Sequence, residues 1–494
     1  MTTDPAPPPG QEQLLSPVRS RLRRFLVDPG SRRFGPGGRV MLAGSPRRLF
    51  RLSEAGAAIV DRIGTGRALV DSPARSELVD RLLDAGVLHP YPTAAEGAAS
   101  VADVTLVVPV RDRAGGLESL LESVLVADDT PVAIVVVDDG STDPDAVRAV
   151  VTAAATADGV AVELVRNEQP RGPAAARNTG LRRVATSLVA MVDSDCRVER
   201  GWLAPLLTQF ADPRVALVAP RVRSREMSRV GLGGVLASYE TLRSPLDLGR
   251  HRSRVAPSTV VPYVPSAAVV ARAGVLAELG GFDEQMSTGE DVDLVWRLVD
   301  DGHRVRYEPS SAVHHDPRTA LRGWLAQRVG YGRSAAALNR RHPGSVAPIV
   351  IGRSSAAVWG VFVAGGPAPA AAVVAVTTVG VVRSIPDLPA RAAAGVALSG
   401  HLAAGRQLAR TAVREWWPIA VGLSVFSRHA RRLLAVAVGV SVVQAWRSGV
   451  DRDRPEISPP AFAALAILDD AAYGVGVWIG CIEQRSFRAL LPRR

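Results

Sequence analysis

The stretch that most constrains the fold is a short apolar run that ends in two closely spaced carboxylates. Leu188 to Val192 contains only apolar residues and is followed by Asp193-Ser194-Asp195. Such a run indicates a strand buried on both faces, as in a parallel sheet covered by helices. Strands of this kind present polar residues at their carboxyl ends, where α/β sheets bind ligands. The two carboxylates suit Mg²⁺ or Mn²⁺, although an Asp-x-Asp sequence is also common in plain loops.

Two earlier apolar runs also end in carboxylates. Residues 104–110 form one expected strand, which leads to Asp112, and residues 134–137 form another, which leads to Asp138 and Asp139. Carboxylates at strand ends can accept hydrogen bonds from a base and a ribose hydroxyl, so they suit a nucleotide better than free phosphate. A helix is expected between these strands, from about Gly116 to Leu125.

The segment between the second run and Asp193 completes a repeating strand–helix pattern. Residues 163–165 are expected to form a strand, and Gly172-Pro173 sets the start of a helix over residues 174–180, which contains Arg177. The start of such a helix turns backbone N–H groups toward a possible diphosphate. The order of strands and helices predicts an α/β fold with half of a doubly wound sheet.

A third group of acids stands at the start of another expected helix. Glu290, Asp291 and Asp293 precede and interleave with apolar residues that share one helix face up to Leu298. Capping and the helix dipole explain one acid, but hardly three. A carboxylate held here can take the proton of an attacking hydroxyl as a general base.

Six segments in this order resemble the signature of inverting family 2 glycosyltransferases with a GT-A fold, a nucleotide-diphospho-sugar transferase fold related to the Rossmann type. The resemblance covers about residues 103–320. The segments are Val-Val-Pro-Val-Arg-Asp-Arg at 107–113, Asp-Asp-Gly-Ser-Thr at 138–142, Ala-Arg-Asn-Thr-Gly at 176–180, Asp-Ser-Asp at 193–195, Gly-Gly-Phe-Asp-Glu at 280–284 and Gly-Glu-Asp-Val-Asp at 289–293.

The resemblance implies a role for each matching residue. It implies a nucleotide-sugar donor held by Asp112, Asp139, Arg177 and Asp193, and a divalent cation, Mg²⁺ or Mn²⁺, held by Asp195, with Asp193 and His315 as further ligands. Asp291 would be the general base, with Glu290 beside it. Either His314 or His315 would make the late contact to metal or diphosphate, and a purely structural histidine pair is the alternative. Between these segments, residues 224–264 are expected to be irregular, with Tyr239, Glu240, Asp247 and Tyr263 available to shape the acceptor site.

The N-terminal part has a separate organisation. Residues 1–20 are expected to be a disordered tail, and residues 21–95 an α+β unit with a strand at 39–42 and helices at 53–63 and 76–83. This unit resembles the small winged-helix, PqqD-like peptide-recognition domains, which implies the precursor peptide as a possible partner. Such a peptide would be expected to add to the exposed edge of the strand at 39–42. A packing or dimerisation unit is the alternative. A linker is expected over residues 90–100.

The chain beyond residue 320 becomes increasingly apolar. Residues 321–345 are expected to form an amphipathic, cationic segment, whose aromatic-plus-arginine pattern suits either the nucleotide edge or a membrane interface. Residues 346–494 are expected to form an apolar helical region. The run 354–382 is long enough for one tilted span or two half-depth helices, whereas the pieces at 417–426, 433–445 and 461–480 are short. The expectation is association with a membrane surface, and a buried helical domain is the alternative.

Charge and cysteine content exclude several classes of protein. The net charge of +11 comes entirely from arginine, because the chain has no lysine, and this pattern is typical of a GC-rich genome. It is weak evidence for nucleic acid, and no nucleic-acid partner is expected. The two cysteines exclude a disulfide framework and a cysteine zinc site. With no apolar signal segment at the start, the expected location is the cytoplasmic face of the cell membrane.

The combination of a PqqD-like head, a family 2 core and an apolar tail resembles the transferases that mature redox cofactors cut from ribosomal peptides. It implies a peptide-derived small-molecule acceptor and glucose from a nucleotide donor, UDP-glucose, added repeatedly. Two alternatives stay open at this stage. One is a cell-wall rhamnosyl- or galactofuranosyltransferase acting on a lipid-linked acceptor, and the other is a peptide-binding protein with an inactive transferase core.

Overall fold

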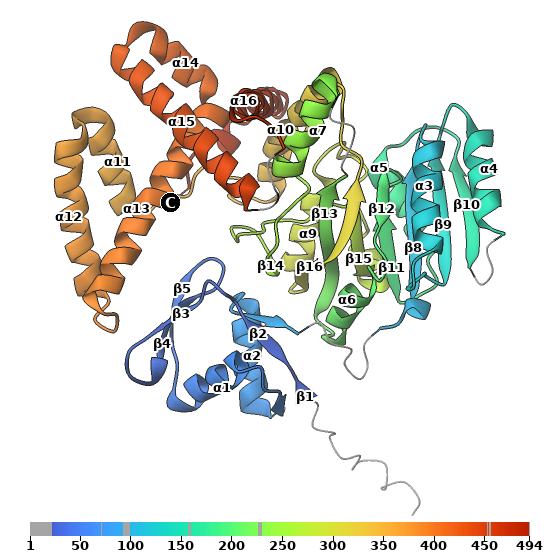
Figure 1. Ribbon diagram of the computed structural model, residues 1–494, viewed down its shortest axis with the longest axis horizontal. Coiled ribbons are helices and arrows are strands. Elements are labelled where there is room, and N and C mark those ends of the chain that lie inside the picture. Colours follow the sequence, from blue (N-terminus) through green and yellow to red (C-terminus); the bar gives the residue numbers. More distant parts are fainter. Residues whose placement is uncertain are drawn as a thin grey trace, which may run out of the picture. The chain divides into compact units, whose positions relative to one another are not determined.

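The computed structural model describes residues 22–70, 72–91, 99–156, 160–225, 230–451, 453 and 456–493 (Figure 1). The chain divides between Tyr91 and Pro92 into two compact units. The tail predicted at residues 1–20 and most of the linker predicted at 90–100 lie outside the described residues.

The first unit combines small antiparallel sheets with two helices. Its strands pair as β1 with β6, β2 with β7, and β3-β4-β5. Ser53 begins the first helix by accepting a hydrogen bond from the N–H of Gly56, as expected for an N-cap. The apolar faces of both helices enclose a core that includes Met41, Val60 and Leu82. The elements are β1 (Leu22–Arg23), β2 (Phe25–Val27), β3 (Arg32–Phe34), η1 (Pro36–Gly38), β4 (Val40–Ala43), β5 (Arg48–Arg51), α1 (Glu54–Gly64), β6 (Leu69–Val70), α2 (Pro73–Asp84) and β7 (Leu88–Pro90).

One expectation for this unit is wrong. The strand predicted at 39–42 was expected to offer an open edge to a peptide, but β4 is the central strand of its sheet. Its residues pair with β3 on one side and with β5 on the other. A peptide could therefore extend this sheet only along β3 or β5.

The second unit is built on a nine-stranded sheet with the order β10-β9-β8-β11-β15-β13-β16-β12, and β14 also pairs with β16. Strands β8, β9, β10 and β11 run parallel to one another, whereas β15 is antiparallel to β11. The strands are β8 (Val104–Val110), β9 (Ala133–Asp139), β10 (Ala161–Asn167), β11 (Leu188–Val192), β12 (Cys196–Val198), β13 (Val215–Ser224), β14 (Ser253–Val255), β15 (Ala268–Arg272) and β16 (Arg304–His315).

Helices cover both faces of this sheet, as predicted from its continuous apolar strands. One core contains Leu106, Ile134 and Leu120, and the other contains Val107, Met191 and Trp296. The α/β expectation is therefore confirmed. The helices of this part are η2 (Val101–Asp103), α3 (Ala114–Leu125), α4 (Pro144–Ala154), α5 (Pro173–Leu181), α6 (Ala204–Leu207), η3 (Thr208–Ala211), α7 (Gly231–Arg243), α8 (Ala273–Glu278) and α9 (Glu290–Asp300).

The segment 224–264 is more regular than expected. It contains α7, a helix of 13 residues, and β14. Three glycines near the N-terminus of α7 and its weak apolar periodicity made this helix difficult to predict from sequence. Tertiary packing stabilises it, because Leu236, Tyr239 and Leu242 are buried in a core shared with later helices.

Seven helices follow the sheet. Figure 1 shows α7, α10 and α16 gathered together, with α11 to α15 extending away from the sheet. The run 354–382 forms two helices, because Gly366 adopts a positive φ of 81° and Pro367 begins the next helix. The helices are α10 (Leu321–Arg341), α11 (Arg353–Gly365), α12 (Pro367–Ser384), α13 (Ala390–Arg414), α14 (Trp417–Phe426), α15 (Arg428–Val450) and α16 (Pro459–Glu483), and η4 (Arg488–Leu490) ends the series.

Among the described residues, α12, α15 and α16 are long and apolar enough to cross a membrane by length and composition. The pieces expected to be short at 433–445 and 461–480 are therefore parts of helices of 23 and 25 residues. The three helices differ in surroundings, since 56% of the apolar window of α16 is buried inside the protein, against 6% for α12 and 11% for α15.

Helix α16 packs against α10 with its backbone. A Cβ added at Gly332 would lie 2.0 Å from the carbonyl oxygen of Tyr473, and one added at Gly476 would lie 2.0 Å from that of Val329. Only glycine permits this approach of two helices. Buried charges reinforce the contact, because Arg328 of α10 donates to Asp469 of α16 at 3.1 Å.

Candidate active site

A buried arginine ties together three of the predicted site residues. Arg177 on α5 donates from Nη2 to Asp193 at 2.6 Å and from Nη1 to Glu290 at 3.2 Å. Its side chain is 4% exposed and stacks over the ring of Phe282. Burial alone would lower the pKa of Arg177, but the two carboxylates outweigh burial and raise it. One guanidinium thus connects the end of β11 to the start of α9.

Asp195 lies next to His315 and Arg113. Its Oδ1 is 3.4 Å from Nε2 of His315, and its Oδ2 accepts from Nη1 of Arg113 at 3.0 Å. Pairing of β12 with β16 brings these residues together, because Cys196 lies opposite His315. His314 instead points to Glu199, at 2.7 Å, since successive residues of a strand face opposite ways. Of the two histidines, His315 is the one beside the Asp-Ser-Asp segment.

Asp291 occupies the first turn of α9. Gly289 precedes the helix with a positive φ of 84°, and the Asp291 carboxylate accepts from the N–H of Val292 at 2.8 Å and of Ser266 at 3.3 Å. Burial, and next the charge of Glu290, raise the pKa of Asp291 to about 7. A carboxyl group with such a pKa can exchange a proton near neutral pH, which is the property of a general base.

Asp112 and Asp139 are placed differently from the other predicted residues. Asp112, at the end of β8, accepts from the N–H and hydroxyl of Thr142 at 2.7 and 2.8 Å, and these bonds lower its pKa. Asp139, at the end of β9, accepts from the N–H of Arg171 and of Gly172 and from Asn167. Asp112 keeps an exposed carboxylate, whereas Asp139 is buried and holds the loop that leads into α5.

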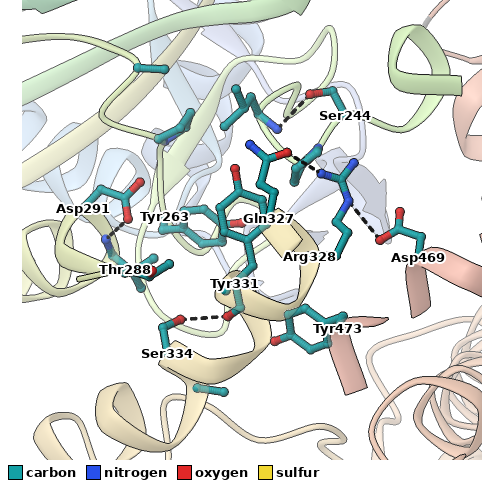
Figure 2. A pocket seen from close by; sticks show the side chains of 18 of the residues that line it. Ser244, Tyr263, Thr288, Asp291, Gln327, Arg328, Tyr331, Ser334, Asp469 and Tyr473 are labelled. Carbon is teal, nitrogen blue, oxygen red and sulfur yellow. Dashed lines mark hydrogen bonds and ion pairs between the residues drawn. The ribbon is translucent and has the colours of Figure 1, made fainter. Parts of the chain in front are cut away.

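Most of the predicted site residues line a single cavity of about 1020 Å³. Six of them line it: Arg177, Asp193, Asp195, Glu290, Asp291 and His315. Asp112 and Asp139 are not among the described residues of its lining and lie at neighbouring strand ends. Figure 2 shows Asp291 and Tyr263 on one side of this cavity, Arg328, Asp469 and Tyr473 on the other, and Tyr331 between them.

The second wall of the cavity comes from the C-terminal helices. Of these, only α10 lies in a segment for which the sequence suggested a nucleotide contact; α13 and α16 were not predicted to reach the site. This wall contains Tyr331 from α10, Arg410 and Arg414 from α13, and Asp470 and Tyr473 from α16. The available signal was the acid pair Asp469-Asp470 inside an otherwise apolar segment, because charges in apolar helices are buried only with partners.

Of the four residues expected to shape the acceptor site, only two line the cavity, namely Asp247 and Tyr263. Tyr239 donates to Asp469 at 2.8 Å, and Glu240 pairs with Arg328 and accepts from Trp324 at 2.6 Å. Both side chains are buried in the joint between α7, α10 and α16. They connect helices and do not face the cavity.

Residues 105–274 match the model of glycosyl transferase family 2. Over 475 residues the chain is 40% identical to the pre-mycofactocin glycosyltransferase of Mycobacterium tuberculosis, covering 94% of this chain and 97% of that protein. The chain belongs to the pre-mycofactocin glycosyltransferase family. This glycosyltransferase therefore has the predicted GT-A fold, and the resemblance to transferases of cofactor maturation is confirmed.

More distant relatives share the catalytic part of this glycosyltransferase. The poly-β-1,6-N-acetyl-D-glucosamine synthase of Staphylococcus aureus is 23% identical over 47% of this chain and 54% of that protein. Among solved structures, a mannosyltransferase of Pyrobaculum calidifontis in complex with GDP-Man and Mn²⁺ is 22% identical and covers 67% of this chain and 94% of that one, with a TM-score of 0.39.

Proposed function

We propose that this glycosyltransferase transfers glucose from UDP-glucose to a hydroxyl of pre-mycofactocin with inversion at the anomeric carbon, and that it repeats the transfer on its product. The observation that carries the proposal is Asp291, a carboxylate with a pKa of about 7 that faces the same cavity as Asp193, Asp195 and His315. The family relative's name supplies the acceptor.

The reaction is a single displacement. Asp291 accepts the proton of the acceptor hydroxyl while the hydroxyl oxygen forms a bond to the anomeric carbon. The bond from that carbon to the diphosphate oxygen breaks on the opposite side, and its electron pair leaves with the nucleoside diphosphate. Attack from the opposite side inverts the anomeric configuration.

Glu290 contributes by position. Arg177 holds the Glu290 carboxylate at 3.2 Å, next to Asp291 in the first turn of α9. The charge of Glu290 disfavours the ionised form of Asp291, which raises its basicity. Arg177 joins Glu290 to Asp193, and it thereby couples the proton acceptor to the predicted donor site.

Asp195 and His315 fit a divalent cation. Their facing atoms are 3.4 Å apart, close to the roughly 3 Å that separates neighbouring ligands around an octahedral Mg²⁺ with bonds of about 2.1 Å. Among the described residues, no group of three His, Cys, Asp or Glu side chains is placed to hold a metal ion, so Asp193 does not complete a three-ligand set with Asp195 and His315. A cation held by Asp195 and His315 alone would keep positions for phosphate oxygens. When bound, the cation supplies Lewis-acid stabilisation of the leaving diphosphate. Asp193, which is paired with Arg177 and lies two residues before Asp195, would bind either the cation or the ribose.

Residues outside the cavity would contribute to donor binding, acceptor binding and location at the membrane. Asp112 offers an exposed carboxylate to the nucleoside, and Asp139 shapes the loop before α5 on which the donor would lie. The first unit would bind the precursor peptide or the acceptor. Apolar side chains exposed on α12, α14 and α15, among them Val376, Leu423 and Phe426, would place the enzyme at the cytoplasmic face of the membrane.

The test is release of nucleoside diphosphate across a panel of sugar nucleotides, with and without pre-mycofactocin. We expect acceptor-dependent release from UDP-glucose that requires a divalent cation, and a β-linked product from the α-linked donor. Asp195→Ala should abolish turnover while its circular dichroism spectrum stays unchanged. Full activity of the wild-type enzyme in excess chelator, or retention of the anomeric configuration, would contradict the proposal.

A further inference from the structure

The end of α13 forms part of the cavity wall. Its last turns present Arg410 and Arg414 four residues apart, on one face of the helix, and both line the cavity. Gly474 of α16 fixes this end of α13 in place, because a Cβ there would lie 2.0 Å from the carbonyl oxygen of Arg414. The close contact of α13 with α16 therefore fixes where the two guanidinium groups begin.

The two arginines have different surroundings. Arg414 stacks on Tyr473 at 3.6 Å from the ring centroid and lies 3.4 Å from carboxylate oxygens of both Asp470 and Glu415. Arg410 makes no hydrogen bond or ion pair with any residue that the structure describes, and its side chain is exposed to the cavity. The charge of Arg414, followed by burial among the helices, lowers the pKa of Arg410. A cation placed beside a second cation is stabilised when a ligand supplies an acceptor oxygen.

Arg410 lies on the wall of the cavity that the C-terminal helices form. The charges that act on it most strongly are those of Arg414, Asp470, Arg243 and Glu415, all on α7, α13 or α16 or directly after α13. The predicted donor and metal residues lie instead on α5, on β16 and after β11.

Tyr263 lines the same cavity as Arg410 and the proposed general base. Burial, and next the charge of Asp291, raise the pKa of the Tyr263 phenol, and the charges of Arg414 and Arg410 oppose this effect. The cavity wall therefore carries both the Asp291 carboxylate and the Arg410 guanidinium. Tyr263, Tyr331 and Tyr473 supply aromatic lining. This lining suits a flat acceptor that has a hydroxyl and an electron-rich oxygen.

We propose that Arg410 is a specificity-determining residue that binds a carboxylate or ketone oxygen of the acceptor and so directs its hydroxyl toward Asp291. This inference rests on the proposed function and deepens it. It assigns the C-terminal helical region a part in acceptor recognition, besides any contact with lipid.

The experiment compares Arg410→Gln with Arg406→Gln in the full-length enzyme. Arg406 is an exposed residue one turn earlier on α13 and does not line the cavity, so its replacement is a matched control. We expect Arg410→Gln to raise the KM for pre-mycofactocin by about 10- to 100-fold, the range for loss of a hydrogen bond to a charged group. Hydrolysis of UDP-glucose without acceptor should stay within twofold of wild type, and Arg410→Lys should restore part of the loss.

Binding gives a second readout. Isothermal titration of pre-mycofactocin into enzyme saturated with UDP should show the same loss for Arg410→Gln. Borohydride treatment of pre-mycofactocin reduces ketones and leaves carboxylates. If the difference between wild type and Arg410→Gln disappears with treated acceptor, the oxygen is a ketone, and if it persists, the oxygen is a carboxylate.

Two results would overturn the inference. One is an unchanged acceptor KM in Arg410→Gln, and the other is an equal loss of UDP-glucose hydrolysis, which would assign Arg410 to the diphosphate. Failure of the wild-type enzyme to use pre-mycofactocin would be a different result, because it would contradict the proposed function before Arg410 is tested.

Discussion

At Asp291, the surroundings that favour proton uptake also make the ionised carboxylate unfavourable. Burial and the neighbouring Glu290 raise its pKa to about 7, and two backbone N–H groups offset this only in part. The raised pKa of Asp291 should therefore affect both the turnover rate and the stability of the folded protein.

Asp291→Asn should lower kcat by at least ~10², the range for a lost general base, with little change in donor affinity. In the wild-type enzyme, kcat/KM for the acceptor should rise with pH through about 7, as the carboxylate loses its proton. Steady-state kinetics between pH 5 and 9 and titration with UDP measure both effects. Near-normal turnover of the variant would show that the base lies elsewhere.

The same variant should be more stable than wild type at high pH. An unfolded aspartate has a pKa of about 3.9, whereas folded Asp291 has one of about 7, so the folded state binds more protons between these values. Stability contributed by this residue is present below about pH 4 and is lost as pH rises through 7. Thermal unfolding should therefore give Asp291→Asn a higher Tm than wild type at pH 8 and an equal one near pH 4. Asp145→Asn, at an exposed helix start, is the control and should show no such crossover.

At the scale of elements, strands with continuous apolar runs were predictable to within a few residues. β8 and β11 have the bounds expected from their runs, because burial on both faces leaves one pattern for such strands. Helices stabilised by distant partners were not predictable in the same way. The 13 residues of α7 depend on burial against α10, α15 and α16. Asp469, which accepts from Tyr239, and Trp324, which donates to Glu240, both lie more than 80 residues away along the chain.

The site shows the same division. That acids at strand and helix ends, such as Asp195 and Asp291, would line one cavity was predictable, because local sequence fixes where they lie. The position of Arg410 on the cavity wall was not predictable, because it depends on how α13 packs against α16. The hydrogen bonds of Asp139 to the loop before α5 were not predictable either, since two of its partners there are backbone N–H groups.

Glycine at the joint of α10 and α16 gives a prediction with an internal control. Gly476→Ala should destabilise the protein by ~1–3 kcal/mol, because the added methyl group would meet the backbone carbonyl of Val329 at 2.0 Å. Gly439→Ala in α15 has open space around it and should be neutral or stabilising by up to about 1 kcal/mol through helix propensity. Chemical denaturation in detergent compares the two. Equal stability of the variants would mean that α10 and α16 can separate without cost.

For the whole molecule, the first unit and the catalytic unit should be separable in activity. Removal of residues 1–95 should leave hydrolysis of UDP-glucose intact, since the predicted donor residues all follow residue 103, and should reduce transfer to the acceptor. Parallel assays of hydrolysis and transfer, together with titration of residues 1–95 with the precursor peptide, measure this. Unchanged transfer by the truncated enzyme, with no peptide binding, would leave the first unit a packing element.

Membrane association should depend on the exposed helices and not on α16. Replacing Leu423 and Phe426 of α14, which are 60% and 90% exposed, by glutamine should reduce flotation with vesicles that contain anionic lipid. Ala466 of α16 is buried, so Ala466→Ser serves as a control that leaves flotation unchanged. Wild-type enzyme that stays entirely in the soluble fraction would contradict the membrane expectation.

A truncation at residue 344, directly after α10, should not give a soluble catalytic unit. Such a cut removes Asp469 from Arg328 and Tyr239 and leaves a buried cation without one of its partners. The C-terminal region therefore packs as part of the catalytic unit. Its apolar helices differ in surroundings, because most of the apolar window of α16 is buried inside the protein, whereas those of α12 and α15 are mostly exposed.

The close contact of α10 with α16 also sets the order in which the enzyme can mature during synthesis. Helix α16 begins at Pro459, so it leaves the ribosome long after the sheet and Asp291 have emerged. A nascent chain can thus form its sheet early, while the acceptor cavity stays open on one side until α16 has emerged. Products of premature stop codons that lie before α16 should accordingly lack acceptor transfer.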